Sequence, residues 1–208
     1  MQAILRTLAP IAVAALVALP AAADDEPGAG AAPETVVAGL EDMLIEHMKA
    51  GDEMSYDQRF ERLRARLAEI LALDRMGRYI FGRDWASLSQ AQRERFTQAF
   101  GDLSAATYAA QFSDYSGERF EPVEVNRQRE DRAVVRRQLV TGSGKQVAFD
   151  YLMTPDEDGD WRIVTIITDG VSDLAIKRSQ YRRILDEADF DAVVERIRAA
   201  IDAQRDGG

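Results

Sequence analysis

The sequence predicts an α+β fold in which helices pack on a four-stranded antiparallel sheet. Apolar residues recur at intervals of three and four through residues 33–112, which is the spacing of one helical face. The interval changes to two through residues 119–168, the period of β-strands, and helical spacing returns after Ser172. A block of strands joined by short loops and flanked by helices is typical of α+β proteins, and such strands pair antiparallel.

The first 23 residues have the pattern of a secretory signal peptide. A short segment with the positive charge of Arg6 precedes the apolar stretch Leu8–Leu19, and Ala21–Ala23 offer an A-x-A cleavage site. The apolar stretch is too short to span a bilayer comfortably, although an uncleaved anchoring helix is the alternative. We therefore expect residues 1–23 to be removed on secretion, which in a Gram-negative bacterium places the chain in the periplasm.

The rest of the chain is long enough for one domain with a sizeable core. Residues 24–33 are rich in Gly, Ala and Pro and are expected to form a flexible leader, followed by a single domain over residues 34–204. The absence of cysteine excludes disulfides and thiolate sites. Without Arg6 the chain has 25 basic and 36 acidic residues, a net charge of −11. This charge argues against a nucleic-acid partner and favours a monomer.

Local signals delimit the helices of the N-terminal half. A first helix over Pro33–Lys49 is expected to stop at Gly51, and a short one is predicted over residues 73–82. Ser55–Gln58 and Ser89–Gln92 each form a capping box, in which the Ser side chain accepts a hydrogen bond from the amide three residues later. The helix after Ser89 carries an apolar stripe of Phe96, Phe100, Leu103, Tyr108 and Phe112.

The four strands are expected at residues 119–127, 132–140, 145–153 and 161–168. The fourth strand is apolar on both of its predicted faces, with Ile163 and Ile167 on one and Val164 and Ile166 on the other. Either helices cover both faces, or one face lines an apolar cavity, because periodicity does not distinguish a core wall from a cavity wall. Two helices follow, one starting after Ser172 and the other near Asp189.

Reactive side chains are sparse. The single histidine, His47, is expected at the boundary of the first helix's apolar stripe, so His-based nucleophile pairs lack candidates. The acidic segment 156–160 lacks the spacing of a calcium loop, and Gly142–Gly144 do not open a helix as a phosphate loop would. We expect no catalytic residue, cofactor or metal. The alternatives are an enzyme with Asp150 or Asp169 acting in an apolar pocket, and an interaction module with an apolar groove.

Basic residues concentrate in two places despite the acidic total. Six lie in the first three strands and their turns: Arg127, Arg129, Arg132, Arg136, Arg137 and Lys145. Four lie on the helix after Ser172: Lys177, Arg178, Arg182 and Arg183. These residues form either a solvated face or a docking patch for an acidic partner or an anionic headgroup.

Three segments resemble the MlaC family, which is also called the toluene-tolerance or ABC-transporter auxiliary family. The segments are Thr107–Glu121, Gln146–Met153 and Trp161–Leu185. The family's Tyr-Ser-Gly-Glu, strand Trp, Gly-Val-Ser and Arg-Ser-Gln-aromatic elements match Tyr115–Glu118, Trp161, Gly170–Ser172 and Arg178–Tyr181, in that order. The resemblance covers residues 34–201. Typical members have Asn-Tyr where this chain has Ile176-Lys177, which looks closer to the branch associated with hopanoid biosynthesis clusters.

The resemblance implies a periplasmic lipid carrier with an NTF2-like cone, in which a curved antiparallel sheet and helices surround an apolar cavity. Family members bind glycerophospholipid acyl chains. They exchange them between an outer-membrane lipoprotein complex and an inner-membrane ABC transporter with an MCE-domain subunit, which maintains outer-membrane lipid asymmetry. The expected cargo is a phospholipid or a hopanoid. Free diffusion of such a lipid through water is negligible, because each exposed methylene costs about 0.8 kcal/mol.

The lining of the expected cavity is assigned to apolar residues of three elements. They are Phe100, Leu103, Tyr108 and Phe112 of the long helix, Phe149, Tyr151, Ile163, Val164, Ile166 and Ile167 of the sheet, and Val171, Leu174 and Ile176 after the last turn. Lys177, Arg178 and Arg182 are expected to contact a headgroup or a docking partner.

Overall fold

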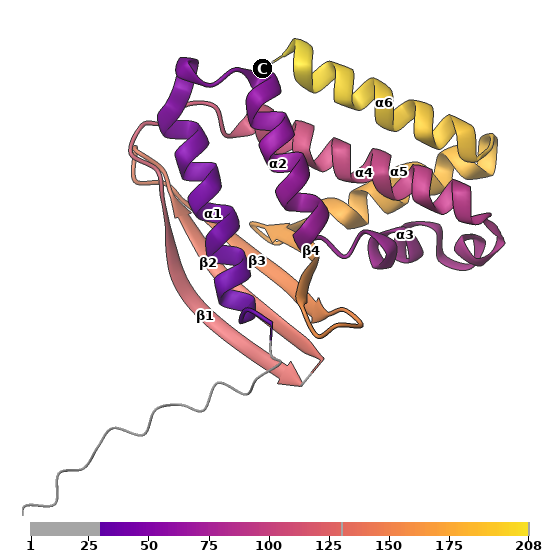
Figure 1. Ribbon diagram of the computed structural model, residues 1–208, viewed down its shortest axis with the longest axis horizontal. Coiled ribbons are helices and arrows are strands. Elements are labelled where there is room, and N and C mark those ends of the chain that lie inside the picture. The colour runs from indigo at the N-terminus through magenta and orange to yellow at the C-terminus, as the bar shows by residue number, and fades with distance from the viewer. Residues whose placement is uncertain (1–29, 130, 208) are drawn as a thin grey trace, which may run out of the picture.

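The computed structural model describes residues 30–129 and 131–207, which form helices packed on one antiparallel sheet (Figure 1). This arrangement confirms the predicted α+β class. The predicted signal peptide and most of the predicted leader lie outside the described residues. Among the residues that the structure describes, no helix is long and apolar enough to cross a membrane.

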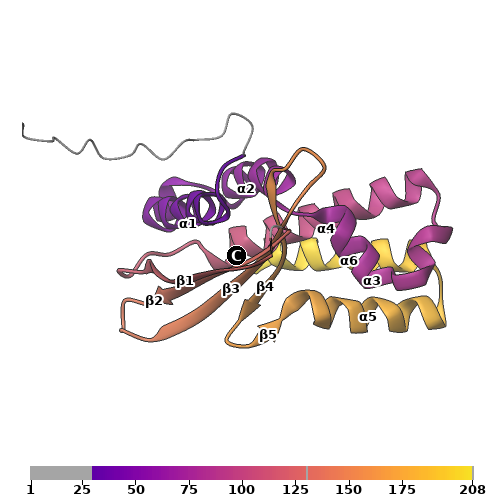
Figure 2. The ribbon, with the colours of Figure 1, turned by 90° about the horizontal axis from the view of Figure 1, so that it is seen from below.

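The N-terminal half is helical, as predicted. Its elements are α1 (Pro33–Ala50), the short 3-10 helix η1 (Gly51–Glu53), α2 (Tyr56–Ile70), α3 (Leu73–Phe81), the 3-10 helix η2 (Gly82–Ser87) and α4 (Gln90–Gln111). Both capping boxes are confirmed, since the Oγ atoms of Ser55 and Ser89 accept from the amides of Gln58 and Gln92 at 3.3 and 3.2 Å. α1 and α2 lie over one face of the sheet (Figure 2).

Five strands form the sheet, in the order in which they occur in the chain. They are β1 (Arg119–Arg129), β2 (Arg132–Val140), β3 (Gln146–Pro155), β4 (Trp161–Thr168) and β5 (Val171–Ser172). The prediction of four strands missed β5, which has only two residues. Asp169 and Gly170 both have positive φ, of 49° and 80°, as a tight two-residue hairpin turn requires.

The C-terminal helices are α5 (Asp173–Glu187) and α6 (Phe190–Asp206). Both helices begin where they were predicted and are capped by side chains, because Ser172 Oγ accepts from the amide of Ala175 at 3.2 Å and Asp189 Oδ1 from that of Ala192 at 3.0 Å. Such caps stabilise a helix by about 1 kcal/mol each. α5 leaves the sheet edge at β5 and packs against α3, while α6 packs along α4 (Figure 2).

A β-bulge at Val164 changes the phase of β4. Tyr151 pairs with Ile166 and Met153 with Ile163, so that three residues of β3 oppose four of β4. Directly opposed residues share a face of the sheet, and Ile163 and Ile166 therefore lie on the same face. The predicted grouping of Ile163 with Ile167 is wrong, because strict alternation stops at the extra residue.

The closed core of the molecule is built around Phe96 in the N-terminal half of α4. Its ring centroid lies 4.8 Å from that of Phe81 and 5.9 Å from that of Trp85, and Phe190 of α6 contacts Phe81 from the other side at 6.1 Å. All four side chains are buried. Gly77 of α3 lies against the Trp85 indole, where a Cβ atom would meet a ring carbon at 2.3 Å.

The layer of α1 also contains buried polar groups. His47, expected at the boundary of the apolar stripe, is instead fully buried, and both of its ring nitrogens lack a hydrogen-bond partner within the described residues. Burial, assisted by the positive charge of Arg62, lowers the pKa of His47 to about 4. Glu41 is buried as well and pairs with Arg137 of β2 at 2.6 Å. This pair fixes α1 on the sheet.

Three of the six basic residues in the first three strands and their turns are paired with acids. Besides Arg137, Arg127 lies 3.4 Å from Glu34 and Arg136 lies 3.7 Å from Asp150. Surface pairs of this kind contribute little stability, typically about 0–1 kcal/mol. They do reduce the free positive charge that a docking patch on β1 and β2 would need.

Candidate functional site

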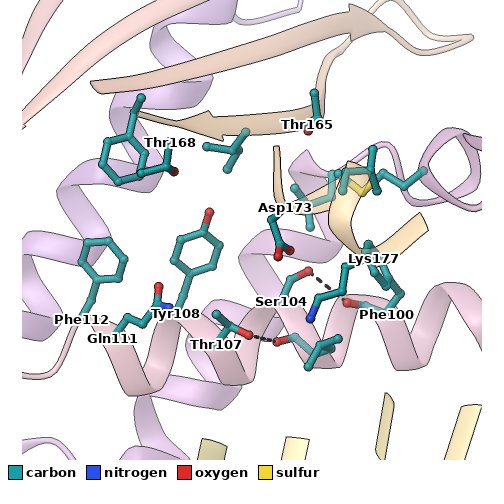
Figure 3. Close-up of a pocket in the computed structure, with 16 residues that line it drawn as sticks. Phe100, Ser104, Thr107, Tyr108, Gln111, Phe112, Thr165, Thr168, Asp173 and Lys177 are labelled. Carbon is teal, nitrogen blue, oxygen red and sulfur yellow. Dashed lines mark hydrogen bonds between the residues drawn. The ribbon is translucent and has the colours of Figure 1, made fainter. Parts of the chain in front are cut away.

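A cavity of about 320 Å³ lies between the C-terminal half of α4, strands β3 and β4, and the first turn of α5. Pockets that hold small organic ligands typically measure about 300–1,000 Å³, so this one is at the lower end of that range. Its lining is half apolar: Leu71, Met76, Phe100, Leu103, Phe112, Phe149, Ile166 and Leu174. The other half is polar: Ser104, Thr107, Tyr108, Gln111, Thr165, Thr168, Asp173 and Lys177 (Figure 3).

α4 supplies one wall through residues on a single helical face. Phe100, Ser104, Thr107 and Gln111 follow one another at intervals of four, three and four, so their side chains project in one direction. The Ser104 hydroxyl donates to the Phe100 carbonyl at 3.0 Å, and the Thr107 hydroxyl donates to the Leu103 carbonyl at 2.8 Å. Because both protons are used within the helix, these hydroxyl oxygens can only accept hydrogen bonds from a ligand.

The sheet supplies the opposite wall. Phe149 of β3 faces Thr168 of β4 in the strand register, and Ile166 lies two residues before Thr168 on the same face. This wall depends on the bulge, because strict alternation through Val164 would turn Ile166 and Thr168 to the other face. Phe120 of β1 packs on the ring of Phe149 with centroids 5.7 Å apart and supports this side of the cavity.

The aromatic residues continue from the sheet to α4. The centroid of Phe120 lies 6.5 Å from that of Phe112, whose ring in turn lies 5.6 Å from that of Tyr108. Figure 3 shows the Tyr108 hydroxyl directed from α4 towards the sheet. Burial, together with the negative charge of Asp173, raises the pKa of Tyr108 well above its ordinary value. The cavity therefore presents a neutral phenol at any physiological pH.

α5 contributes the charged residues. Its cap Ser172 bonds the Thr165 hydroxyl at 3.2 Å, which fixes the start of the helix beside β4. Asp173 and Lys177 follow at the first and second turns, and the buried Leu174 lies between them in the chain. Asp173 is exposed and Lys177 is half-buried, so this part of the cavity reaches solvent. Within the described residues, neither side chain forms an ion pair closer than 4.0 Å.

Seven of the predicted lining residues meet in this cavity: Phe100, Leu103, Tyr108, Phe112, Phe149, Ile166 and Leu174. Six do not line it. Tyr151 and Ile163 share the inner face of the sheet but are buried in the closed core, and Val164 and Ile167 are half-buried elsewhere on β4. Val171 and Ile176 are 55% and 44% exposed, because β5 and the outer face of α5 turn them to solvent.

The three predicted headgroup or partner residues have different surroundings. Lys177 lines the cavity. The guanidinium of Arg178 stacks 4.8 Å from the centre of the Tyr79 ring, and that of Arg182 donates to the Phe81 carbonyl at 2.9 Å and to Asp84 at 2.6 Å. The two arginines thus fasten α5 to α3 and η2.

Eight lining residues were missed by sequence reasoning, most of them because they are polar: Leu71, Met76, Ser104, Thr107, Gln111, Thr165, Thr168 and Asp173. Ser104, Thr107 and Gln111 could have been predicted from their helical spacing to Phe100, if polar residues had been considered as lining.

The two carboxyls named for an enzymatic alternative lie outside the cavity. Asp150 faces Arg136, and Asp169 accepts from the amide of Ala148 at 2.9 Å in the hairpin turn.

The chain matches the MlaC protein family over residues 39–199. It belongs to the MlaC family. Among solved structures, its fold is similar to that of a phospholipid-binding protein from Ralstonia solanacearum in complex with a phospholipid. The TM-score is 0.72 at 16% sequence identity, over 84% of this chain and 99% of the other. No curated protein matches the sequence. Within the described residues, no cluster of His, Asp and Glu that could hold a metal ion is present in this MlaC protein.

Proposed function

We propose that this protein is a periplasmic lipid carrier that shields acyl chains in the cavity between α4, the sheet and α5. The observation that carries the proposal is the position of the cavity, which brings seven apolar or aromatic residues of the three predicted elements to one space. Membership of the MlaC family and the likeness in fold to a phospholipid-binding protein support the same function.

The physical argument for a carrier is the cost of exposing acyl chains. Each exposed methylene costs about 0.8 kcal/mol, so a lipid with on the order of 30 methylenes faces a barrier of ~20 kcal/mol in water. An apolar lining removes most of this barrier without any chemical step. The cavity of about 320 Å³ is small for a two-chain lipid, so loading must widen it. We also propose that the sheet and the helices form an NTF2-like cone around this cavity.

The cargo on this proposal is a phospholipid or a hopanoid, exchanged between an outer-membrane lipoprotein complex and an inner-membrane MCE-domain ABC transporter. The signal-peptide pattern of residues 1–23 supports a periplasmic location. Phe100, Leu103, Phe112, Phe149, Ile166 and Leu174 would contact the chains, and Lys177 would contact the headgroup.

Native mass spectrometry of the purified protein, followed by extraction and identification of bound lipid, tests the proposal. We expect a stoichiometric lipid to be retained, or to be taken up from vesicles after the protein has been stripped. Protein that is empty as purified, and stays empty after incubation with phospholipid vesicles and with hopanoids, would contradict the carrier function.

A further inference from the structure

The polar half of the cavity gathers charged and hydrogen-bonding groups from two helices at its solvent side. Figure 3 shows the carboxyl of Asp173 and the amine of Lys177 on α5 directed towards Ser104 and Thr107 on α4. The two charged residues are one helical turn apart, and no contact between them within 4.0 Å occurs in the described part of the chain. Each charge is therefore available to a ligand that enters the cavity.

The hydrogen-bonding capacity of these groups is directional. Ser104 and Thr107 already donate their protons to helix carbonyls, so their oxygens only accept. An ionised Asp173 also only accepts. These three acceptors face the same space, and Lys177 adds a donor and a positive charge beside them. A fitting ligand carries a proton-donating cation next to an anion.

We propose that Asp173, Ser104, Thr107 and Lys177 form a headgroup subsite that selects lipids bearing a primary ammonium group. Asp173 and the two hydroxyl oxygens accept from the ammonium, and Lys177 contacts the phosphate of the same headgroup. The subsite rests on the proposed carrier function and narrows its cargo. It also assigns headgroup contacts to Ser104, Thr107 and Asp173, which were not predicted from the sequence.

The chemistry of common headgroups separates them at this subsite. Phosphoethanolamine supplies three N–H donors and a positive charge, which satisfies all the acceptors. Choline is equally charged but has no N–H donor, so the acceptors would lose their bonds to solvent without compensation. A glycerol headgroup has O–H donors but no positive charge to oppose Asp173. The subsite therefore ranks ethanolamine above both.

A primary ammonium could also come from an amine-bearing hopanoid, which has no phosphate. The two sources are distinguished by Lys177, because only a phosphate gives that residue an anionic partner. Loss of the Lys177 charge weakens retention of a phospholipid and leaves retention of an aminated hopanoid unchanged.

A competition loading experiment tests the subsite. Stripped protein is incubated with vesicles that contain equal amounts of phosphatidylethanolamine, phosphatidylcholine and phosphatidylglycerol with identical acyl chains, and the bound lipids are quantified by mass spectrometry. We expect phosphatidylethanolamine to be enriched about fivefold over each of the others, the value expected for one partly exposed charge-assisted contact. Asp173→Asn should abolish the enrichment, because the variant no longer offers a negative charge to the ammonium group.

Asp191→Asn is the matched control, because it makes the same change in the first turn of α6, outside the cavity lining. It should retain the wild-type preference. Lys177→Gln should lower the occupancy of all three phospholipids in the same proportion, and a parallel incubation with an aminated hopanoid should show no change. Equal loading of the three lipids by the wild type, or an enrichment that survives in Asp173→Asn, would overturn the subsite while leaving the carrier function intact. Failure to load any lipid would overturn both.

Discussion

The two halves of α4 carry one continuous apolar stripe but face different surroundings. In the N-terminal half, Phe96 packs against the rings of Phe81, Trp85 and Phe100 and is fully buried. In the C-terminal half, Leu103 and the C-cap residue Phe112 are also buried, but they line the cavity. The difference lies in what packs opposite: η2, α3 and α6 close over the first half, whereas the curved sheet and the start of α5 leave a space over the second.

This contrast shows that stability and binding draw on the same residue types in neighbouring turns of one helix. A residue of the closed core contributes mainly to folding, because all of its contacts are already made. A residue of the cavity wall has contacts still to make, which a ligand can supply. Substitutions that separate the two contributions therefore test the assignment of each half.

Truncation of Phe96 should have the largest effect. Phe96→Ala removes a ring that is enclosed on all sides and should lower the free energy of unfolding by about 3–5 kcal/mol. Phe112→Ala, the matched change in the cavity wall, should cost roughly half of this, because part of the ring surface already faces empty space. Urea unfolding monitored by circular dichroism measures both. Equal losses would mean that the two halves of α4 are packed alike.

The pH dependence of stability should come from the closed side of the molecule. The pKa of His47 is lowered from 6.5 to about 4 in the folded protein, so the unfolded chain binds a proton more readily. The contribution of His47 is complete above pH 6.5 and is lost as the pH falls towards about 4, by a total of roughly 3 kcal/mol.

Urea unfolding of the wild type and of His47→Leu at pH 7.5 and pH 4.5 isolates this effect from the titration of carboxylates. The wild type should lose more stability between the two values than the variant does, by roughly 2–3 kcal/mol. A parallel pH response in the two proteins would show that the buried imidazole is already protonated at low pH in the folded state.

A charge placed on the sheet wall should affect binding more than folding. Ile166→Asp puts a carboxylate where an acyl chain would lie and should reduce lipid occupancy by about tenfold or more, because the chain would desolvate the charge. In the empty protein the carboxylate reaches the cavity water, so the unfolding midpoint should change less. Val164→Asp is the control on the same strand, since Val164 does not line the cavity. A loss of occupancy as large in Val164→Asp would contradict the placement of the bulge.

Removal of one hydroxyl in the cavity should have the smallest effect. Tyr108→Phe keeps the ring and deletes the phenol oxygen that faces the sheet, so stability should change by no more than about 0.5 kcal/mol. Retention of acyl chains should rise slightly, because one polar group no longer has to be desolvated. Thermal unfolding and lipid retention after gel filtration measure the two quantities. A marked drop in either would show that the hydroxyl makes a contact on which the cavity depends.

Local signals were sufficient to predict much of this fold. The capping boxes at Ser55 and Ser89 and the helix starts after Ser172 and near Asp189 depend on interactions within four residues, and the structure confirms them. Long-range features were not predictable in the same way. The bulge at Val164 lies in a run of apolar residues, where a shift in the alternation of inward and outward side chains does not change the sequence pattern. β5 has only two residues and is too short to show a period.

The cavity itself was predicted by residue type but not by position. Tyr151 and Phe149 are both aromatic residues on the same face of β3, yet one lies in the core and the other in the cavity wall. The two residues differ in what packs against them in the folded protein. Neither the period of the strand nor its composition predicts that packing. The polar lining was missed because the prediction assumed an entirely apolar wall. A ligand with a headgroup needs polar as well as apolar surface.

The bulge at Val164 allows the chain length of β4 to change without altering the cavity. Val164 is the extra residue of the strand, so deletion of its codon would restore strict alternation and keep Ile163, Ile166 and Thr168 on the inner face. The strand can therefore lose one residue at this point without exchanging the residues of the cavity wall.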